Sequence, residues 1–241
     1  MISSNIEDFK SKINLFYTQN HIKKQKDGQD YYYQESSEMA DGIVELTLLN
    51  GMILFKLPKE FEIKTDILDK IIHSYHNSTD IEKQFEERIT EKRYLFFARS
   101  VNLKHPKPAE TTIRQLTDSD KKAFQDLKER TSKDDDEVSF VEMNHPVVFG
   151  CFYKDQLVAV SSNLNWGDDL CDIGILTDKR FRRMGYALAT VAALCNYNAK
   201  RGKINQYRCT DENYKSYKTA LSLGFKNWGL IYTIDSNRKQ T

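Results

Sequence analysis

The chain has 241 residues, 39% of them hydrophobic and 12% aromatic, and a formal net charge of +1. This composition supplies enough apolar surface for one large or two smaller cores and argues against disorder. A near-neutral charge gives no global field that would attract nucleic acid, and no stretch approaches the roughly 20 apolar residues of a membrane helix. We therefore expect a folded protein that binds neither nucleic acid nor a membrane.

The first hundred residues predict a small α/β unit. Apolar periodicity predicts a helix over residues 6–24. Two apolar runs, residues 43–49 and 52–57, flank Asn50-Gly51, the dipeptide that favours a type I′ turn, and so predict a β-hairpin. Two further helices and a strand are expected at residues 66–75, 81–93 and 94–100.

Residues 102–110 have the composition of a linker. Two of the four prolines lie there, and proline disfavours helix in the residue before it. We therefore divide the chain into an N-terminal lobe, residues 1–105, and a C-terminal domain, residues 110–241. The lobe carries no active-site motif, and the sequence also allows a homodimer.

Cysteine and histidine spacing predicts neither disulfides nor a metal site. All four cysteines lie in the second half without paired spacing: Cys151, Cys171, Cys195 and Cys209. His73 and His76 have a spacing that suits metal binding on a helix, but no third ligand type lies nearby. We expect reduced thiols in a cytoplasmic protein and no metal.

The C-terminal domain places a basic, glycine-containing turn between a strand and a helix. Strands are predicted at residues 147–152 and 156–162, joined at Lys154-Asp155, and at residues 170–176. Apolar residues at helical spacing follow the turn: Ala187, Leu188, Val191, Ala192 and Cys195. A helix N-terminus offers unpaired N–H groups and the positive end of the helix dipole. The turn therefore predicts a ligand with a diphosphate, although a solvated basic loop would fit these residues too.

Two motifs resemble those of the GNAT N-acyltransferase superfamily. Arg182-x-x-Gly185-x-Ala187 has neither the three glycines of a dinucleotide fingerprint nor the Gly-Lys-Ser/Thr of a P-loop. It is similar to the (Gln/Arg)-x-x-Gly-x-(Gly/Ala) turn with which that superfamily binds the pyrophosphate of coenzyme A. Downstream, Asn213-x-x-Ser216 and then Gly224-Phe225 resemble its second motif, Asn-x-x-Ala followed by Gly-Phe. Between residues 112 and 235 the predicted order β-α-β-β-β-α-β-α-β also matches this fold, apart from an undefined stretch at residues 134–144.

The resemblance implies an α/β fold (α+β mixed sheet), with a GNAT-like domain preceded by the small α/β lobe. That lobe is either a degenerate GNAT-like lobe or an unrelated cap or dimerisation domain. The implied function is transfer of an acyl group, most simply acetyl, from acetyl-CoA to a primary amine of a small molecule, amino acid or peptide. A non-catalytic acyl-CoA-binding or regulatory protein is the alternative.

The resemblance also implies which residues bind the acyl donor. Backbone groups of Ile175, Leu176 and Thr177 would hold the pantetheine arm near the thioester. The pyrophosphate would lie at the turn and the start of the following helix: Arg182, Arg183, Met184, Gly185, Tyr186, Ala187 and Leu188. Lys179 with Arg180 or Arg183 would reach the 3′-phosphate, and Asn213 and Ser216 would complete the site.

The residues that would move protons are less clearly marked. Many relatives place a tyrosine seven residues after the asparagine, where this chain has Ala220. Tyr217, one turn earlier, is the substitute general acid; packing of its ring and a water acid are the alternatives. Asp172, on the strand before the turn, is the candidate base. Glu142 and His145 are alternative bases, since they precede the strand at residues 147–152.

Overall fold

The structure is a computed structural model that describes residues 2–26, 28–59, 68, 70–72, 78–101 and 108–238. The chain forms two compact units. The first contains Met1–Leu95, Cys209–Tyr214 and Asn227–Thr241, and the second contains Phe96–Arg208 and Lys215–Lys226. The units therefore do not follow the division near residues 105–110, because two C-terminal segments belong to the first unit. Residues 102–107 of the predicted linker lie outside the described residues.

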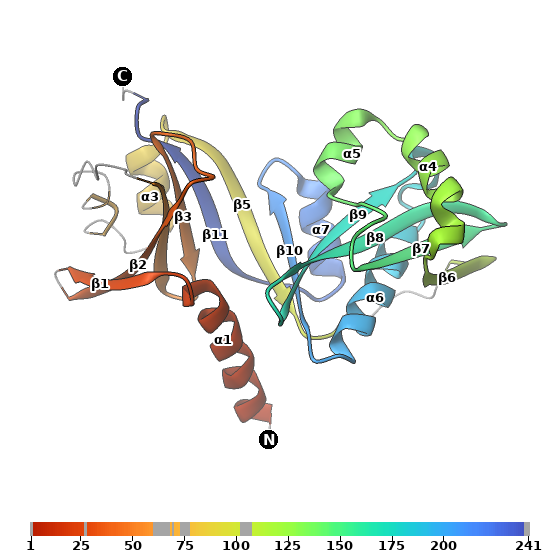
Figure 1. Ribbon diagram of the computed structural model, residues 1–241, viewed down its shortest axis with the longest axis horizontal. Coiled ribbons are helices and arrows are strands. Elements are labelled where there is room, and N and C mark those ends of the chain that lie inside the picture. Colours follow the sequence, from red (N-terminus) through yellow and green to blue (C-terminus); the bar gives the residue numbers. More distant parts are fainter. Residues whose placement is uncertain are drawn as a thin grey trace. The chain divides into compact units, whose positions relative to one another are not determined.

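The first unit is built on a mixed sheet with strand order β1-β2-β4-β3-β11-β5. Strands β2 and β4 are parallel, whereas β1 with β2, β3 with β4, and β11 with β3 are antiparallel. Its elements, coloured by sequence in Figure 1, are α1 (Ile2–Thr18), β1 (Ile22–Lys26), β2 (Gln29–Ser36), β3 (Ile43–Leu49), β4 (Met52–Pro58), α3 (Ser78–Phe85), β5 (Ile89–Ala98) and β11 (Lys226–Asp235).

The core of the first unit joins the sheet to its helices. Ile81 and Phe85 of α3 are fully buried in one apolar cluster with residues of β3, β4 and β11, including Phe55 and Tyr232. Helix α1 contributes Phe9, whose ring meets Trp228 of β11 edge to face at 5.1 Å between centroids. Strand β11 is thus part of this core, although it is the last strand in the sequence.

Two predicted helices of the first unit were too long. Helix α1 ends at Thr18, whereas the prediction carried it to residue 24. Residues 22–24 instead begin β1, which pairs with β2 in the register Ile22↔Tyr33. Helix α3 ends at Phe85, and β5 begins at Ile89, before the predicted start of that strand. Of the helix predicted at 66–75, residues 68 and 70–72 are helical, and the rest lies outside the described residues. His73 and His76 lie outside them as well.

The β3–β4 hairpin is confirmed. Its two turn residues, Asn50 and Gly51, both have positive φ, 51° and 83°, as a type I′ turn requires.

The second unit contains a mixed sheet with strand order β10-β9-β8-β7-β6. Only β9 and β10 are parallel in this sheet; the other neighbouring strands are antiparallel. Its elements are β6 (Thr111–Gln115), η1 (Asp118–Asp120), α4 (Lys121–Glu129), α5 (Lys133–Ser139), β7 (Val147–Tyr153), β8 (Gln156–Trp166), β9 (Leu170–Thr177), η2 (Lys179–Phe181), α6 (Tyr186–Ala199), β10 (Ile204–Thr210) and α7 (Tyr214–Ser222).

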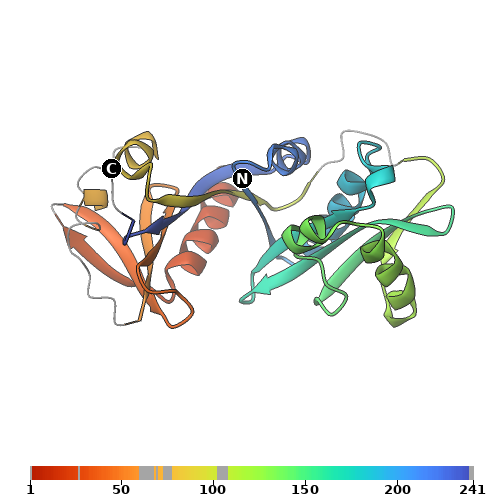
Figure 2. The same cartoon turned by 90° about the horizontal axis from the view of Figure 1, so that it is seen from above.

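The order of elements predicted between residues 112 and 235 is confirmed, and so is a mixed α/β fold. Helix α5 covers the first part of the undefined stretch at residues 134–144, and a loop follows it. Helix α6 covers one face of the sheet, and α4 and α5 cover the other (Figure 2). On the α4 side, Phe124 and Leu127 pack on Val160 and Leu176 of β8 and β9. None of the described helices is long and apolar enough to cross a membrane.

Candidate functional site

Strands β9 and β10 part halfway along β9. Their parallel pairing joins Leu170–Asp172 to Ile204–Gln206 and goes no further, although β9 continues to Thr177. On its other side β9 stays paired with β8 as far as Thr177. The second half of β9 therefore has one edge outside the β9–β10 pairing, and this half contains Ile175, Leu176 and Thr177.

The turn after β9 is held by a buried aspartate. Asp178 is 1% exposed and is the N-cap of η2, where its carboxylate accepts a hydrogen bond from the backbone N–H of Arg180 at 3.0 Å. The same carboxylate accepts from the guanidinium groups of Arg180 at 2.7 Å and Arg130 at 2.8 Å. Arg130 also donates to the carbonyl of Leu157 at 2.9 Å. These bonds fix the path of the turn between β9 and α6.

Gly185 is the N-cap of α6 and adopts the left-handed conformation, with φ of 85°. A Cβ at this position would make only ordinary contact with Pro108, so it is the backbone conformation that favours glycine here. No side chain caps this end of α6. Because the first N–H groups of a helix lack intrahelical partners, this end of α6 can bind an anion.

The residues predicted to bind the pyrophosphate differ in their exposure and in their contacts. The ring of Tyr186 is buried against Tyr153 and Phe181, so only its backbone is available to a ligand. Met184 and Arg183 are exposed at the turn, and Arg183 has a positive φ of 65°. The guanidinium of Arg182 is paired with Asp135 of α5 at 2.9 Å and donates to the carbonyl of Thr177 at 3.3 Å.

Asp172 lies on β9 where the pairing with β10 ends. Its carboxylate accepts hydrogen bonds from Gln206 at 3.0 Å and from the guanidinium of Arg208 at 2.6 Å. That guanidinium in turn lies over the ring of Trp166, 4.3 Å from its centroid. Both carboxylate oxygens are bonded, since Arg208 reaches each of them. The predicted role of Asp172 as a base would require the loss of one of these bonds.

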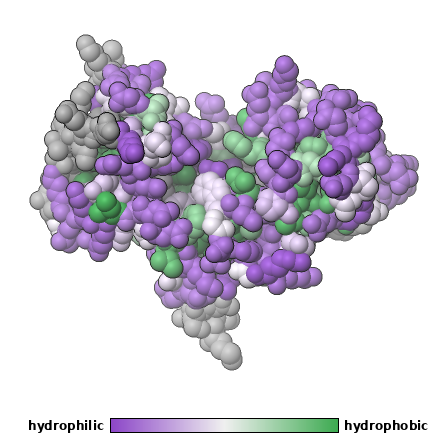
Figure 3. All heavy atoms as spheres, viewed as in Figure 1, coloured by the Kyte–Doolittle hydropathy of each residue, from purple (hydrophilic) through white to green (hydrophobic). Residues whose placement is uncertain are grey.

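The chain after α5 approaches β9 closely at Gly174. A Cβ at Gly174 would collide with the carbonyl oxygens of Ser139 and Phe140, so only glycine allows this approach. Phe140 follows α5 with φ of 50°, and its side chain is 73% exposed. Val138 and Leu164 are also exposed. Apolar surface, green in Figure 3, lies beneath α5.

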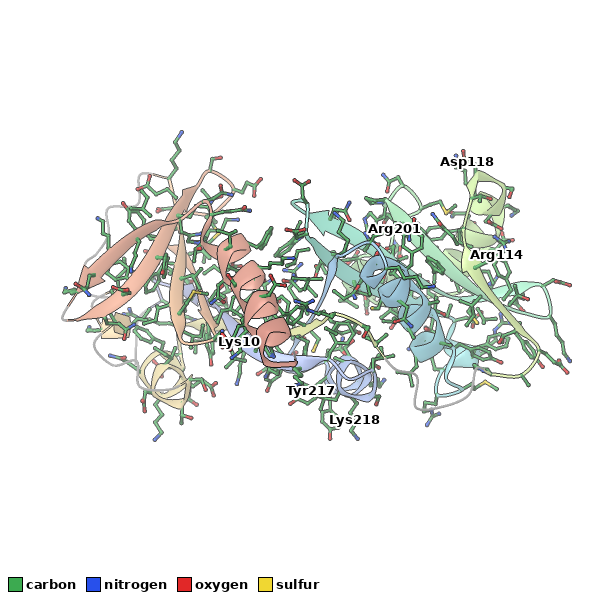
Figure 4. The ribbon with its side chains drawn as sticks, turned by 90° about the horizontal axis from the view of Figure 1, so that it is seen from below. Lys10, Arg114, Asp118, Arg201, Tyr217 and Lys218 are labelled. Carbon is green, nitrogen blue, oxygen red and sulfur yellow. The ribbon has the colours of Figure 1, made fainter. Side chains whose placement is uncertain are left out.

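Helix α7 carries the predicted acid. Tyr217 lies beside Lys218 on this helix (Figure 4), is half-buried, and its ring meets Phe96 edge to face at 5.3 Å between centroids. Ser216 accepts a hydrogen bond from the hydroxyl of Tyr207 at 3.3 Å. Asn213 belongs to the first unit, so its predicted part in the site stays a prediction. Ala220 is fully buried.

A family model described as "GNAT acetyltransferase" matches residues 61–232, more than half of the chain. The chain belongs to the GNAT acetyltransferase family. No curated protein matches the sequence.

Three solved structures illustrate the likeness. An acetyltransferase from the GNAT family of Colwellia psychrerythraea has 14% identity and a TM-score of 0.51 over 93% of this chain and 95% of that one. A GNAT-family protein from Novosphingobium aromaticivorans DSM 12444 has 15% identity and a TM-score of 0.48 over 61% of this chain, which spans 65% of that protein's length. An aminoglycoside N-acetyltransferase solved in complex with CoA has 20% identity and a TM-score of 0.40 over 52% of this chain and 93% of that one. The first of these supports the GNAT fold.

Sequence reasoning missed several residues around the GNAT turn and β9. Asp178 stood inside the basic segment but was given no role, and Arg130 lies 48 residues before it. Arg208 and Trp166 were also missed. Arg208 contacts Asp172 and the ring of Trp166, and these three residues lie on different strands, so the sequence alone does not show the contacts. Gly174 carried a signal, as a glycine inside a predicted strand indicates close approach of another backbone. Among the described residues, no group of three or more His, Cys, Asp or Glu side chains could hold a metal ion.

The paired carboxylate of Asp178 predicts a loss of stability in acid. The hydrogen bond from Arg180 lowers the pKa of Asp178 from 3.8 to about 2. Asp178 therefore stabilises the fold fully above pH 4, and this contribution is lost as the pH falls toward 2. The shift corresponds to about 2 kcal/mol, because one pKa unit is worth roughly 1.4 kcal/mol.

The variant Asp178→Asn should be about 2 kcal/mol less stable than the wild type at pH 7 and nearly as stable at pH 2, in urea unfolding. Asp120, whose pKa the side-chain hydrogen bond from Arg114 also lowers to about 2, is the matched control. Asp120→Asn should remove a similar dependence of the unfolding free energy on pH, because the lowered pKa causes that dependence and Asp120 lies outside the turn. An Asp178→Asn variant that keeps the wild-type slope between pH 4 and pH 2 would contradict this account.

Proposed function

We propose that this GNAT family member transfers the acetyl group of acetyl-CoA to a primary amine of a small molecule, amino acid or peptide. The observation that carries the proposal is the N-terminus of α6, which no side chain caps and where Gly185 is in the left-handed conformation. It follows the half of β9 that lies outside the β9–β10 pairing. Such an end suits a pyrophosphate, and a free strand edge suits an extended amide chain such as pantetheine. Both groups occur together in CoA.

The residues around the turn fit this ligand by charge and by shape. Exposed Lys179, Arg180 and Arg183 add positive charge next to the helix end, where a 3′-phosphate would be attracted. Arg182 would exchange Asp135 for a phosphate oxygen. Backbone groups of Ile175, Leu176 and Thr177 would hold the pantetheine arm, and Asn213 and Ser216 would complete the site.

For the leaving thiolate we propose Tyr217 as the proton donor. Its ring packs on Phe96, which would fix the direction of the hydroxyl. Tyr217→Phe should lower kcat about 10²-fold with little change in CoA affinity, because the ring stays and only the proton donor is lost. Steady-state rates and calorimetry test this.

Tyr217→Ala serves as the contrasting variant. It should in addition lower the melting temperature, because it removes the ring that packs on Phe96. Wild-type kcat in Tyr217→Phe, with lost stability only in Tyr217→Ala, would leave Tyr217 as a packing residue and water as the acid.

The second candidate function is non-catalytic acyl-CoA binding. It is favoured by Ala220, which is fully buried and stands where many relatives have the acid tyrosine. A thiol-release assay with acetyl-CoA against a panel of primary amines separates the two functions. Release with one amine class supports the transferase, whereas CoA binding by calorimetry without release from any amine supports the binder.

The remaining proposals concern the protein's surroundings. We place the reaction in the cytoplasm, where thiols stay reduced; the four cysteines are free and buried. The acceptor and acetyl-CoA are the partners that the function requires, and neither nucleic acid nor a membrane takes part. A homodimer would show as a doubled mass in light scattering.

A further inference from the structure

His145 lies on the loop between α5 and β7, on the face of the sheet that α4 and α5 cover. Its Nδ1 is 2.8 Å from the hydroxyl oxygen of Ser162 on β8. Ser162 is fully buried, whereas the imidazole is half-buried. The ring is therefore held at one nitrogen and is partly exposed.

The pairing of Ser162 in the sheet shows which residue of β9 lies level with the imidazole. Ser162 pairs with Gly174, and directly paired residues of antiparallel strands point to the same face. Gly174 is the position at which the chain after α5 touches β9, and Ile175 follows it. His145 thus stands one strand away from β9, at the level where the proposed pantetheine-binding segment begins.

Burial favours the neutral form of the His145 ring near pH 7. Burial lowers the pKa of His145, Glu142 on the same loop raises it, and Lys128 of α4 lowers it. Lys128 is itself paired with Glu142 at 2.8 Å and with Asp136 of α5 at 3.2 Å. The positions on β8 and β9 at this level, Ser162 and Gly174, carry no charge. A neutral imidazole can accept a proton.

Asp172, the other candidate base on this part of the sheet, is less able to accept a proton. Both oxygens of Asp172 accept hydrogen bonds from Arg208, and one also accepts from Gln206. Glu142, the third candidate, is paired with Lys128. A base must be able to take a proton without first breaking an ion pair, and His145 meets this condition.

We propose that His145 is the base that takes the proton from the acceptor amine. This role rests on the proposed acetyl transfer. With its Nδ1–H donating to Ser162, the imidazole has its lone pair on Nε2. The ammonium N–H bond breaks, its proton moves to Nε2, and the freed nitrogen pair forms the bond to the thioester carbon. The C–S bond then breaks with its electron pair on sulfur, and Tyr217 gives its proton to the thiolate. The extra amine proton restores the Tyr217 hydroxyl through water, and the imidazolium returns its proton through water to the solvent. Ser162 is a positioning residue.

The test is the pH profile of kcat/KM, measured with the best amine from the panel. The wild type should lose activity on the acid side as His145 becomes protonated. His145→Gln should lower kcat/KM about 10²-fold and remove this acid limb, while CoA affinity by calorimetry stays unchanged. Added imidazole should restore part of the rate to His145→Ala.

Two further variants separate a catalytic role from a structural one. Ser162→Ala keeps the ring and should change the position of the acid limb rather than remove it. His21→Gln is the matched control, because burial also lowers the pKa of half-buried His21 in the first unit; it should keep both rate and profile.

Each outcome decides between the proposals. An unchanged acid limb in a folded His145→Gln variant overturns the role of His145 and leaves the transferase intact. If His145→Gln fails to fold, an unchanged acid limb in Ser162→Ala overturns the role instead. A wild type that binds CoA but acetylates no amine removes the proposed function, and the role of His145 with it.

Discussion

A chain truncated after Lys226 should lose the fold of its first unit and keep that of its second. The deletion removes β11, which pairs with β3 from Ile43 to Leu49. It also removes two fully buried residues of the first core, Tyr232 and Ile234. Loss of each such side chain costs roughly 2–5 kcal/mol, and β3 loses a whole row of backbone hydrogen bonds. The total is comparable with the entire stability of a domain, about 5–15 kcal/mol.

Hydrogen exchange measured by mass spectrometry would check this result strand by strand. In the truncated chain, the amides of β3 and β4 should exchange at rates of an unfolded chain, whereas those of β7 and β8 should stay protected. A chain truncated after Arg238, which keeps β11, is the control and should protect both sets. Protection of β3 and β4 without β11 would mean that residues 1–105 fold as the separate lobe the sequence predicted.

Elements with strong local signals were predictable from the sequence. Asn50-Gly51 fixed the β3–β4 hairpin, and Lys154-Asp155 the β7–β8 hairpin, where both residues have positive φ. Strand β1 had no such signal. Lys23 and Lys24 are exposed, and the segment is a strand because β2 offers it a hydrogen-bonding edge. The place of β11 in the first unit was equally hidden, since pairing between β3 and β11 joins residues far apart in the sequence.

The same distinction holds for the site. The turn at Gly185 could be predicted because its glycine, its basic residues and the helix that follows are neighbours in the sequence. The turn is supported by a hydrogen bond from Arg130 to Asp178, two residues that are 48 positions apart. The carboxylate of Asp172 is bonded by Arg208, which is 36 positions away. A single sequence cannot show such pairs. The sequence therefore does not indicate which of the candidate carboxylates is already paired in the fold.

Gly185→Val should weaken binding of acetyl-CoA by about 30-fold or more. A β-branched residue at φ of 85° is strained by roughly 2 kcal/mol, so the turn in the free variant should relax to another conformation. Binding of acetyl-CoA must then restore the left-handed conformation. Each 1.4 kcal/mol of free energy that this change requires lowers the affinity tenfold. The added side chain also stands at the helix end where the pyrophosphate is expected. Calorimetric titration with acetyl-CoA measures the effect.

Gly202→Val is the matched control for this variant. Gly202 also has a positive φ, 76°, and open space around its Cβ position, and it lies in the turn after the other end of α6. Both variants should lose a similar amount of stability, because the backbone strain is the same, but only Gly185→Val should lose affinity. Gly185→Ala should fall between the wild type and valine, since alanine is less strained there. Unaltered affinity in Gly185→Val would exclude the N-terminus of α6 as the CoA site and, with it, the observation on which the proposed transferase depends.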